Sequence, residues 1–328
     1  MDPRVFVQSR NLMFKATNLY YLHDYSQQMV AEKLNISVST VSRLLAKSTE
    51  NGIVKLKIDP MVEKVIALEE KLKELLKIRE VIVAPSDSSL ALDSRLAVAL
   101  EGARYLQNRI DDNTKLGIGF GGTINQLIFY LNPCKKTNTS FVMLHGRIST
   151  QEYQSDMKKA LQRISNVFGG HGYLLETDAY LTNKGAYEHA MRHKNVKEIF
   201  ELYEKLNVSV CGLGAIYPEQ DSALLDPDCI ECPEITQFLQ KNIACGDIFL
   251  NFFDKNGREC KRGDGIYNMS IPFEVYRKIP TKLIVVAGKK KAEAALAALR
   301  GGLVDVLVVD KPLAEILVNR IEKDHALD

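Results

Sequence analysis

The apolar positions between residues 26 and 54 predict two short amphipathic helices joined by a tight turn. Asn35 begins the turn, and Ser37 is placed to cap a second helix that runs through Ala46. The inward-facing apolar positions of this pair are Met29, Val30, Leu34, Ile36, Val41, Leu44 and Leu45. Helices of this length and spacing predict a helix-turn-helix.

The outer face of the second helix is polar near its start, which is where a helix-turn-helix presents side chains to base edges and phosphates. Arg43 is the best base or phosphate contact on this face. An ordinary helical hairpin with solvated serines is the alternative interpretation. The candidate DNA contacts are Ser37, Ser39, Thr40, Ser42 and Arg43.

The segment after the second helix favours the DNA-binding interpretation. A turn at Gly52 is followed by Val54, Leu56 and Ile58 in alternation with lysines, which predicts the strand of a wing. Residues 1–58 contain eight Lys and Arg against four Asp and Glu, a net charge of +4, whereas the remaining 270 residues carry −2. The positive charge lies where DNA would bind, so residues 1–59 are predicted to be a winged helix-turn-helix domain.

A heptad pattern follows the predicted wing. Pro60 marks the junction, and residues 60–79 are predicted to be a linker helix. Two heptads are short for a free-standing coiled coil, so a helix that packs on its own domain and a helix that contacts a second copy are both open. The apolar seam consists of Met61, Val65, Leu68, Leu72 and Leu75.

The remaining residues, 80–328, alternate short β-branched runs with amphipathic segments. Continuous apolar strands separated by helices predict a parallel sheet that is covered on both faces, which is a Rossmann-like α/β domain. The predicted strands are residues 81–84, 116–120, 141–144, 208–213, 283–287 and 304–309. The predicted helices are residues 92–107, 123–130, 156–168, 196–205 and 290–299.

Composition limits the cellular setting and the metal chemistry. No apolar run approaches the ~20 residues that span a bilayer, and the first residues do not resemble a signal peptide, so we expect a cytoplasmic protein without a membrane partner. The six cysteines are then expected to be free thiols. Cys229 and Cys232 form the single close pair and have neither a second such pair nor spaced histidines nearby, so no metal site is predicted.

The carboxyl ends of parallel strands are the places to look for a ligand. A buried strand runs into a glycine-rich turn before a helix, and such a turn can close backbone N–H groups around a phosphate. A dinucleotide fingerprint is formally present, but the acidic residue expected about 20 positions later is absent, so no cofactor is predicted. The residues of this phosphate loop are Gly119, Gly121, Gly122 and Thr123.

A second strand end carries positive charge. Gly288 follows a buried strand, and Lys291 is one of three lysines that open the next helix. Lysines at a helix N-terminus are unfavourable without an anion, because the helix dipole already places positive potential there. A third strand end leads through Gly212 and Gly214 to Asp221, and it is weak evidence when taken alone.

These segments together resemble the SorC-type sugar-binding transcriptional regulators of bacteria over nearly the whole chain. The resemblance rests on the helix-turn-helix, on GIGFGGT, CGLGAI and CGDIFLNFFDKNG, and on AGKKKAEAALAALRGG near the end. It implies an effector domain related in fold to ribose-phosphate isomerase and glucosamine-phosphate deaminase, in a homodimer or homotetramer that binds operator DNA. It also implies that a phosphorylated sugar binds Gly119, Gly121, Gly122, Thr123, the acidic residue Asp247 and the helix-start residue Lys291.

The chain departs from this family at one strand end. In members that hold deoxyribose phosphate through a Schiff base, this strand ends in a lysine, whereas His145 stands here and is followed by Gly146 and Arg147. An imine at this position is therefore excluded. His145 and Arg147 remain candidate effector contacts, with a surface charge as the alternative for Arg147.

The predicted function is transcriptional regulation of a carbohydrate-utilisation operon by a phosphorylated sugar, without enzymatic activity. The alternative is a phosphosugar isomerase or deaminase with a fused helical head. An isomerase needs a base next to the substrate carbonyl, and the sequence offers Asp247 and His145 without a supporting partner.

Overall fold

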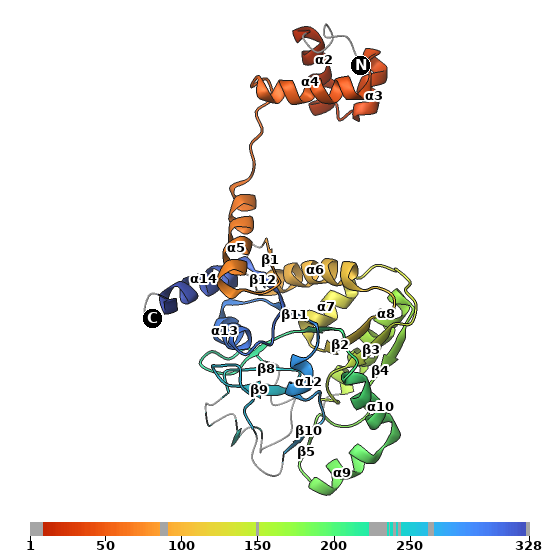
Figure 1. The fold of residues 1–328 in the computed structure, drawn as a ribbon, viewed down its shortest axis with the longest axis vertical. Helices are drawn as coiled ribbons and strands as arrows, with labels where there is room; N and C mark the ends of the chain where they lie inside the picture. Colours follow the sequence, from red (N-terminus) through yellow and green to blue (C-terminus); the bar gives the residue numbers. More distant parts are fainter. Residues whose placement is uncertain are drawn as a thin grey trace. The chain divides into compact units, whose positions relative to one another are not determined.

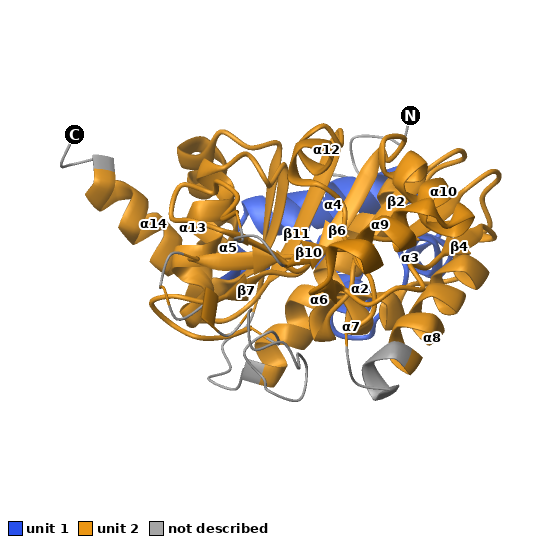
Figure 2. Ribbon diagram, turned by 90° about the horizontal axis from the view of Figure 1, so that it is seen from below, with its two compact units in different colours: residues 1–62 blue, residues 63–328 orange. Residues whose placement is uncertain are grey.

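The computed structural model describes residues 9–85, 91–148, 151–222, 235, 237–238, 241, 244–261 and 266–325. The chain divides into two compact units, residues 1–62 and residues 63–328 (Figure 2). Each unit has hydrophobic clusters of its own.

Three helices build the described part of the first unit: α2 (Arg10–Tyr21), α3 (Gln27–Leu34) and α4 (Val38–Glu50). A serine side chain caps each of them by accepting a backbone N–H, and Asn35 ends α3 in the left-handed conformation with a φ of 52°. The predicted helix, turn and helix are therefore present. Their core consists of Met13, Ala16, Val30, Ala31, Val41, Leu44 and Leu45.

Two details of this pair differ from the prediction. Met29 is 48% exposed rather than inward-facing, whereas its neighbour Val30 is fully buried in the core with residues of α2 and α4. Helix α4 continues to Glu50, four residues beyond the predicted end, and the hydroxyl of Ser48 in its last turn donates to the Leu45 carbonyl at 2.7 Å.

The described residues do not contain the predicted wing. Gly52 makes the expected turn with a φ of 68°, but residues 54–58 lie in no strand, and Leu56 and Ile58 are 67% and 62% exposed. An alternating pattern forms a stable strand only where another strand pairs with it, and the described part of residues 9–62 contains none.

The helix α5 (Pro60–Leu76) carries the heptad seam. Leu72 is fully buried in the main core of the second unit, and Val65, Leu68 and Leu75 pack against the same core. Ile66, outside the seam, is 49% exposed. Four of the five seam residues thus pack on the chain's own second unit.

A seven-stranded parallel sheet forms the centre of the second unit (Figure 1). Its order is β1-β12-β11-β6-β2-β3-β4, and all six predicted strands belong to it. The seventh strand, β4, was not predicted because its three residues are exposed or half-buried and include a glycine. The strands are β1 (Glu80–Ala84), β2 (Lys115–Gly119), β3 (Ser140–Met143), β4 (His171–Tyr173), β6 (Val208–Cys211), β11 (Thr281–Val286) and β12 (Val306–Asp310).

Helices cover both faces of this sheet, as predicted. Successive strand residues such as Val81 and Ile82 belong to two different hydrophobic clusters, because side chains along a strand alternate between faces. One face packs against α6 (Ala91–Arg109), α7 (Gly122–Tyr130) and α8 (Gln151–Phe168). The other packs against α5, α10 (Lys194–Tyr203), α13 (Ala292–Arg300) and α14 (Lys311–His325).

Two small antiparallel sheets lie outside the predicted elements. One contains β7 (Gly214–Ala215), β8 (Gly246–Ile248) and β9 (Asn251–Phe253), and the other contains β5 (Tyr180–Leu181) and β10 (Tyr267–Asn268). Further helices in the described part are α9 (Lys184–Arg192), α12 (Phe273–Arg277) and the 3-10 helix η2 (Lys289–Lys291). β8 and η2 each carry a residue of the predicted ligand site.

None of the described helices is long and apolar enough to cross a membrane. Cys134, Cys211, Cys245 and Cys260 are free thiols, and the described residues contain no group of three or more potential metal ligands. Cys229 and Cys232 lie outside the described residues.

Candidate functional site

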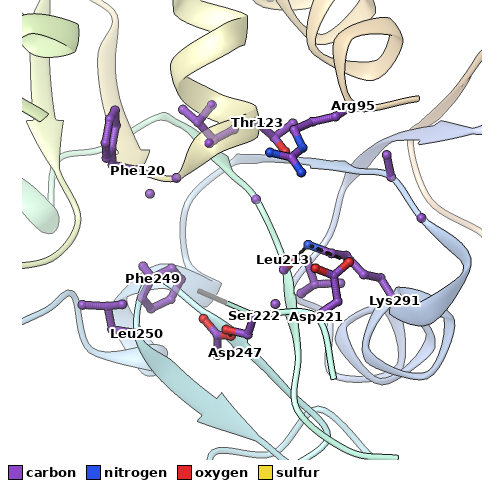
Figure 3. A pocket seen from close by; sticks show the side chains of 18 of the residues that line it. Arg95, Phe120, Thr123, Leu213, Asp221, Ser222, Asp247, Phe249, Leu250 and Lys291 are labelled. Atoms are coloured by element: carbon purple, nitrogen blue, oxygen red, sulfur yellow. Dashed lines mark hydrogen bonds and ion pairs between the residues drawn. The ribbon is translucent and has the colours of Figure 1, made fainter. Parts of the chain in front are cut away.

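A cavity of about 310 Å³ opens at the carboxyl ends of β2, β6 and β11 (Figure 3). These neighbouring strands are parallel, so their carboxyl ends meet at one edge of the sheet. Seven of the nine predicted effector contacts line the cavity. They are Gly119, Gly121, Gly122, Thr123, Asp247, Gly288 and Lys291.

The glycine turn forms one wall of the cavity. Gly119 ends β2, where a Cβ would lie 2.8 Å from the Cys211 sulfur on the neighbouring strand, so a side chain does not fit. Gly121 directly precedes α7, and its carbonyl accepts the first helical hydrogen bond, from the Asn125 N–H at 2.8 Å. The free N–H groups of the first turn of α7 thus begin at the cavity, where they favour an anion.

Lys291 is the one cavity-lining lysine among the three that open the helical segment. Lys289 and Lys290 are exposed, whereas the Lys291 side chain is only 18% exposed. Its Nζ donates to the Leu213 carbonyl at 2.6 Å and lies 3.8 Å from a carboxylate oxygen of Asp221. Burial lowers the pKa of Lys291, and the nearby charges of Asp221 and Asp247 oppose that shift.

Arg95, which the sequence did not single out, adds a second positive charge. It projects from α6 to the same cavity, and one of its terminal nitrogens lies 3.5 Å from the position that a Cβ on Gly122 would occupy. The charge of Arg95 contributes to the lowered pKa of Lys291. A single arginine on an amphipathic helix carries no spacing signal, so it could only be found from the fold.

Asp247 brings a buried carboxyl group to the cavity. It lies in β8, is 7% exposed, and accepts a hydrogen bond from the Ser222 hydroxyl at 2.6 Å. Burial raises the pKa of Asp247 to about 6, and the hydrogen bond from Ser222 and the charge of Lys291 oppose the shift. Gly214 pairs with Asp247 across β7 and β8, and a Cβ there would overlap the carboxylate.

The cavity has two chemically different ends (Figure 3). Arg95 and Lys291 lie at one end, and Phe120, Phe249 and Leu250 lie at the other. Ile148 also lines the cavity. An anion with an attached carbon skeleton matches this division of charge and apolar surface.

Two predicted effector contacts do not line the cavity, and the prediction is corrected for both. His145 is fully buried, its Nδ1 lies 2.8 Å from the Gly146 carbonyl oxygen, and burial lowers its pKa. Arg147 donates to the Asp178 carboxylate at 3.2 Å. The chain after β3 makes isolated bridges from His145 to Ser270 and from Arg147 to Asp178, which hold both residues away from the cavity.

The candidate DNA contacts lie on and just before α4. Ser37, Ser39, Ser42 and Arg43 are exposed. The prediction is wrong for Thr40, which is fully buried and whose hydroxyl lies 3.0 Å from that of Ser37. Thr40 lies one position before the core residue Val41, so it falls at the inward edge of the helix face.

The model of a sugar-binding domain family matches residues 61–319. The deoxyribonucleoside regulator of Bacillus subtilis (strain 168) is 27% identical over 314 residues, which are 95% of this chain and 98% of that protein. The sorbitol operon regulator of Klebsiella pneumoniae is 24% identical and covers 94% of this chain and 97% of its own length.

Solved structures show the same fold. The crystal structure of the full-length sorbitol operon regulator SorC from Klebsiella pneumoniae has a TM-score of 0.73 at 24% identity, covering 94% of this chain and 98% of that one. A transcriptional regulator from Streptococcus pneumoniae TIGR4 has a TM-score of 0.70 at 21% identity, covering 79% of this chain and 98% of that one.

The fold and the family match define the second unit as a sugar-binding α/β domain. The chain belongs to the SorC-type family of sugar-binding transcriptional regulators. This confirms the prediction of a regulator rather than an enzyme.

Proposed function

We propose that this protein is a bacterial regulator of a carbohydrate-utilisation operon, whose operator binding is controlled by a phosphorylated sugar in the cavity at the ends of β2, β6 and β11. The observation that carries the proposal is the convergence of Lys291, Arg95 and the start of α7 on one cavity that also holds Asp247. Charge-assisted hydrogen bonds from such groups suit a phosphate, and a carboxylate accepts hydrogen bonds from sugar hydroxyls.

The arrangement favours a sugar phosphate over a neutral sugar. Burial lowers the pKa of Lys291, and the positive charge of Arg95 adds a smaller contribution in the same direction, so a bound dianion would stabilise the charged form of Lys291. The carboxylates of Asp221 and Asp247 offset part of the positive charge of Lys291. The glycine turn, which also lines the cavity, is the proposed position of the anion.

The DNA-binding part of the proposal rests on α4. Its exposed face combines Arg43 with three serines at the start of a capped helix, which is the part of a helix-turn-helix that enters the major groove. One such helix reads only a few base pairs, so we expect a homodimer or homotetramer on a palindromic operator.

Calorimetry on the full chain tests the effector site. Inorganic phosphate, a panel of sugar phosphates and the corresponding unphosphorylated sugars are titrated into the parent, Lys291→Ala and Lys290→Ala. Removal of one charge-assisted partner costs about 1.5 to 3 kcal/mol, so Lys291→Ala should weaken phosphate binding by roughly 10- to 150-fold. Lys290→Ala removes the same charge one position away, on an exposed side chain, and should change the affinity by less than about twofold.

Two results would contradict the proposal. In the first, both variants bind phosphate and sugar phosphates as the parent does, which would show that the cavity is not the anion site. In the second, the parent binds the unphosphorylated sugars as tightly as their phosphates, which would remove the role of Lys291 and Arg95.

A further inference from the structure

The turn between β8 and β9 has an unusual backbone for its sequence. Ile248 pairs with Asn251, so Phe249 and Leu250 form a two-residue hairpin turn, and their φ angles are 39° and 67°. Two-residue turns with positive φ at both positions normally contain Asn and Gly, because bulky side chains are strained there. Such strain is found where a particular side-chain placement is needed for function.

The surrounding structure holds this turn in place. The Phe249 ring packs against Phe273 and Tyr276, with ring centroids 5.7 and 4.6 Å apart. The Leu250 carbonyl accepts a hydrogen bond from the Tyr180 hydroxyl at 2.7 Å. Both turn residues are 5% exposed, so their conformation is fixed by buried contacts from separate elements.

The left-handed turn brings two successive residues, Phe249 and Leu250, to the lining of one cavity. Asp247 in β8 and Phe249 in the turn both line the cavity. In a continued strand Leu250 would point to the opposite face, but here it lines the cavity as well. One hairpin thus contributes a carboxylate and, beside it, the apolar end formed with Phe120 (Figure 3).

We propose that the Phe249–Leu250 turn determines effector specificity by selecting phosphorylated ligands whose end remote from the phosphate carries C–H groups rather than hydroxyls. This inference rests on the proposed function, because the phosphate at Lys291 and Arg95 sets which part of the ligand reaches the turn. A hydroxyl placed against Phe120, Phe249 and Leu250 leaves water and meets side chains that offer no hydrogen bond, which is unfavourable.

Simple alkyl phosphates test this selection without knowledge of the natural effector. The probes are inorganic phosphate, n-butyl phosphate and 4-hydroxybutyl phosphate, titrated into the full chain by calorimetry. The alkyl ester should bind more tightly than its hydroxylated partner by roughly ten- to a hundredfold, which is the range of discrimination that an apolar pocket achieves against an added hydroxyl. D-fucose 1-phosphate and D-galactose 1-phosphate, which differ by one remote hydroxyl, should follow the same order.

The variant Leu250→Asn locates the selection. Asn tolerates the left-handed conformation and adds a hydrogen-bonding group to the apolar end. It should reduce the preference for the alkyl ester to within about twofold and leave the affinity for inorganic phosphate within about twofold of the parent, which also shows that the variant is folded. Leu100→Asn, at a half-exposed position of α6 outside the cavity, should keep the parent's preference.

Equal affinity of the parent for the two butyl probes would overturn the inference, even if no variant could be purified. An unchanged preference in Leu250→Asn would overturn it too, since the selection would then come from elsewhere in the cavity. Failure of inorganic phosphate and all four phosphate esters to bind would instead contradict the proposed function, and the inference with it.

Discussion

Arg43 and Lys291 are both proposed to bind phosphate groups, but the chain presents them in opposite ways. Arg43 is exposed on α4, and its guanidinium donates to the Ser39 carbonyl and hydroxyl of its own helix, at 3.3 and 3.4 Å. Lys291 is mostly buried, and its Nζ contacts Leu213 and Asp221 from other segments. One cation keeps its water, whereas the other has already lost most of it.

This difference shows how the same charge serves two kinds of ligand. A small effector offers few contacts, so the group that binds it must be positioned before the effector arrives. DNA offers many phosphates, and a solvated side chain can adjust to them while counterions are released. Effector binding should therefore depend weakly on salt and operator binding strongly.

Gly122→Asp should cause the largest change, a loss of effector affinity. A carboxylate about 4 Å from the bound phosphate would cost about 4 kcal/mol at an effective dielectric constant of 20, or roughly a thousandfold in effector affinity. Calorimetry with inorganic phosphate measures the loss. Gly122→Ala is the matched control: a Cβ there would lie 3.5 Å from Arg95, so the added volume fits and only the charge differs. A similar loss in both variants would assign the effect to volume.

Asp247→Asn should change the pH dependence of folding in the effector-free protein. The pKa of Asp247 is raised from 3.8 to about 6, so the folded protein holds this proton more tightly than the unfolded chain does. The resulting stability is fully present below pH 3.8 and is lost as the pH rises toward 6. A shift of about two pKa units corresponds to about 3 kcal/mol.

Asn cannot titrate and can still accept the Ser222 hydrogen bond. The unfolding free energy of Asp247→Asn, relative to the parent, should therefore increase by up to about 3 kcal/mol between pH 4 and 7. Urea denaturation at both pH values provides the measurement. A difference that stays constant with pH would show that Asp247 does not titrate in this range.

The main sheet was predictable because its strands are buried on both faces and appear as continuous apolar runs. The glycine turn was predictable for a similar reason, since strand, glycines and helix are adjacent in sequence. Arg95 and the Phe249–Leu250 turn were not, because they reach the cavity through tertiary packing that no local pattern records.

His145 and Thr40 show the opposite failure. Each lies next to residues predicted for the same role, and sequence position alone suggested that role. A bridge to Ser270 holds His145 inside the core, and the helical rotation of one residue turns Thr40 inward beside Val41. Proximity in sequence to the other candidate contacts was thus insufficient to place these two side chains.

Arg43→Ala tests the role of the exposed cation in operator binding. A specific contact to a base or phosphate contributes about 1–3 kcal/mol, so operator affinity should fall roughly 5- to 150-fold. The slope of log affinity against log salt should also decrease by about one if Arg43 contacts a phosphate. Fluorescence anisotropy at several salt concentrations measures both. Lys15→Ala, an exposed charge on α2, is the control, and an equal effect of the two variants would indicate only a general charge contribution.

Ser37→Ala should have the smallest effect, and it separates capping from DNA contact. The Ser37 hydroxyl accepts the Thr40 N–H at 3.2 Å and lies 2.9 Å from the Ser39 hydroxyl. Loss of a serine cap costs about 1 kcal/mol, so hydrogen exchange of the first amides of α4, measured on the full chain, should accelerate about fivefold. Ser39→Ala leaves the cap and should not accelerate this exchange. If the free energy of operator binding lost in Ser37→Ala is larger than the free energy lost from α4, Ser37 also contacts DNA. If the two losses match, its contribution is to hold the start of the helix in place.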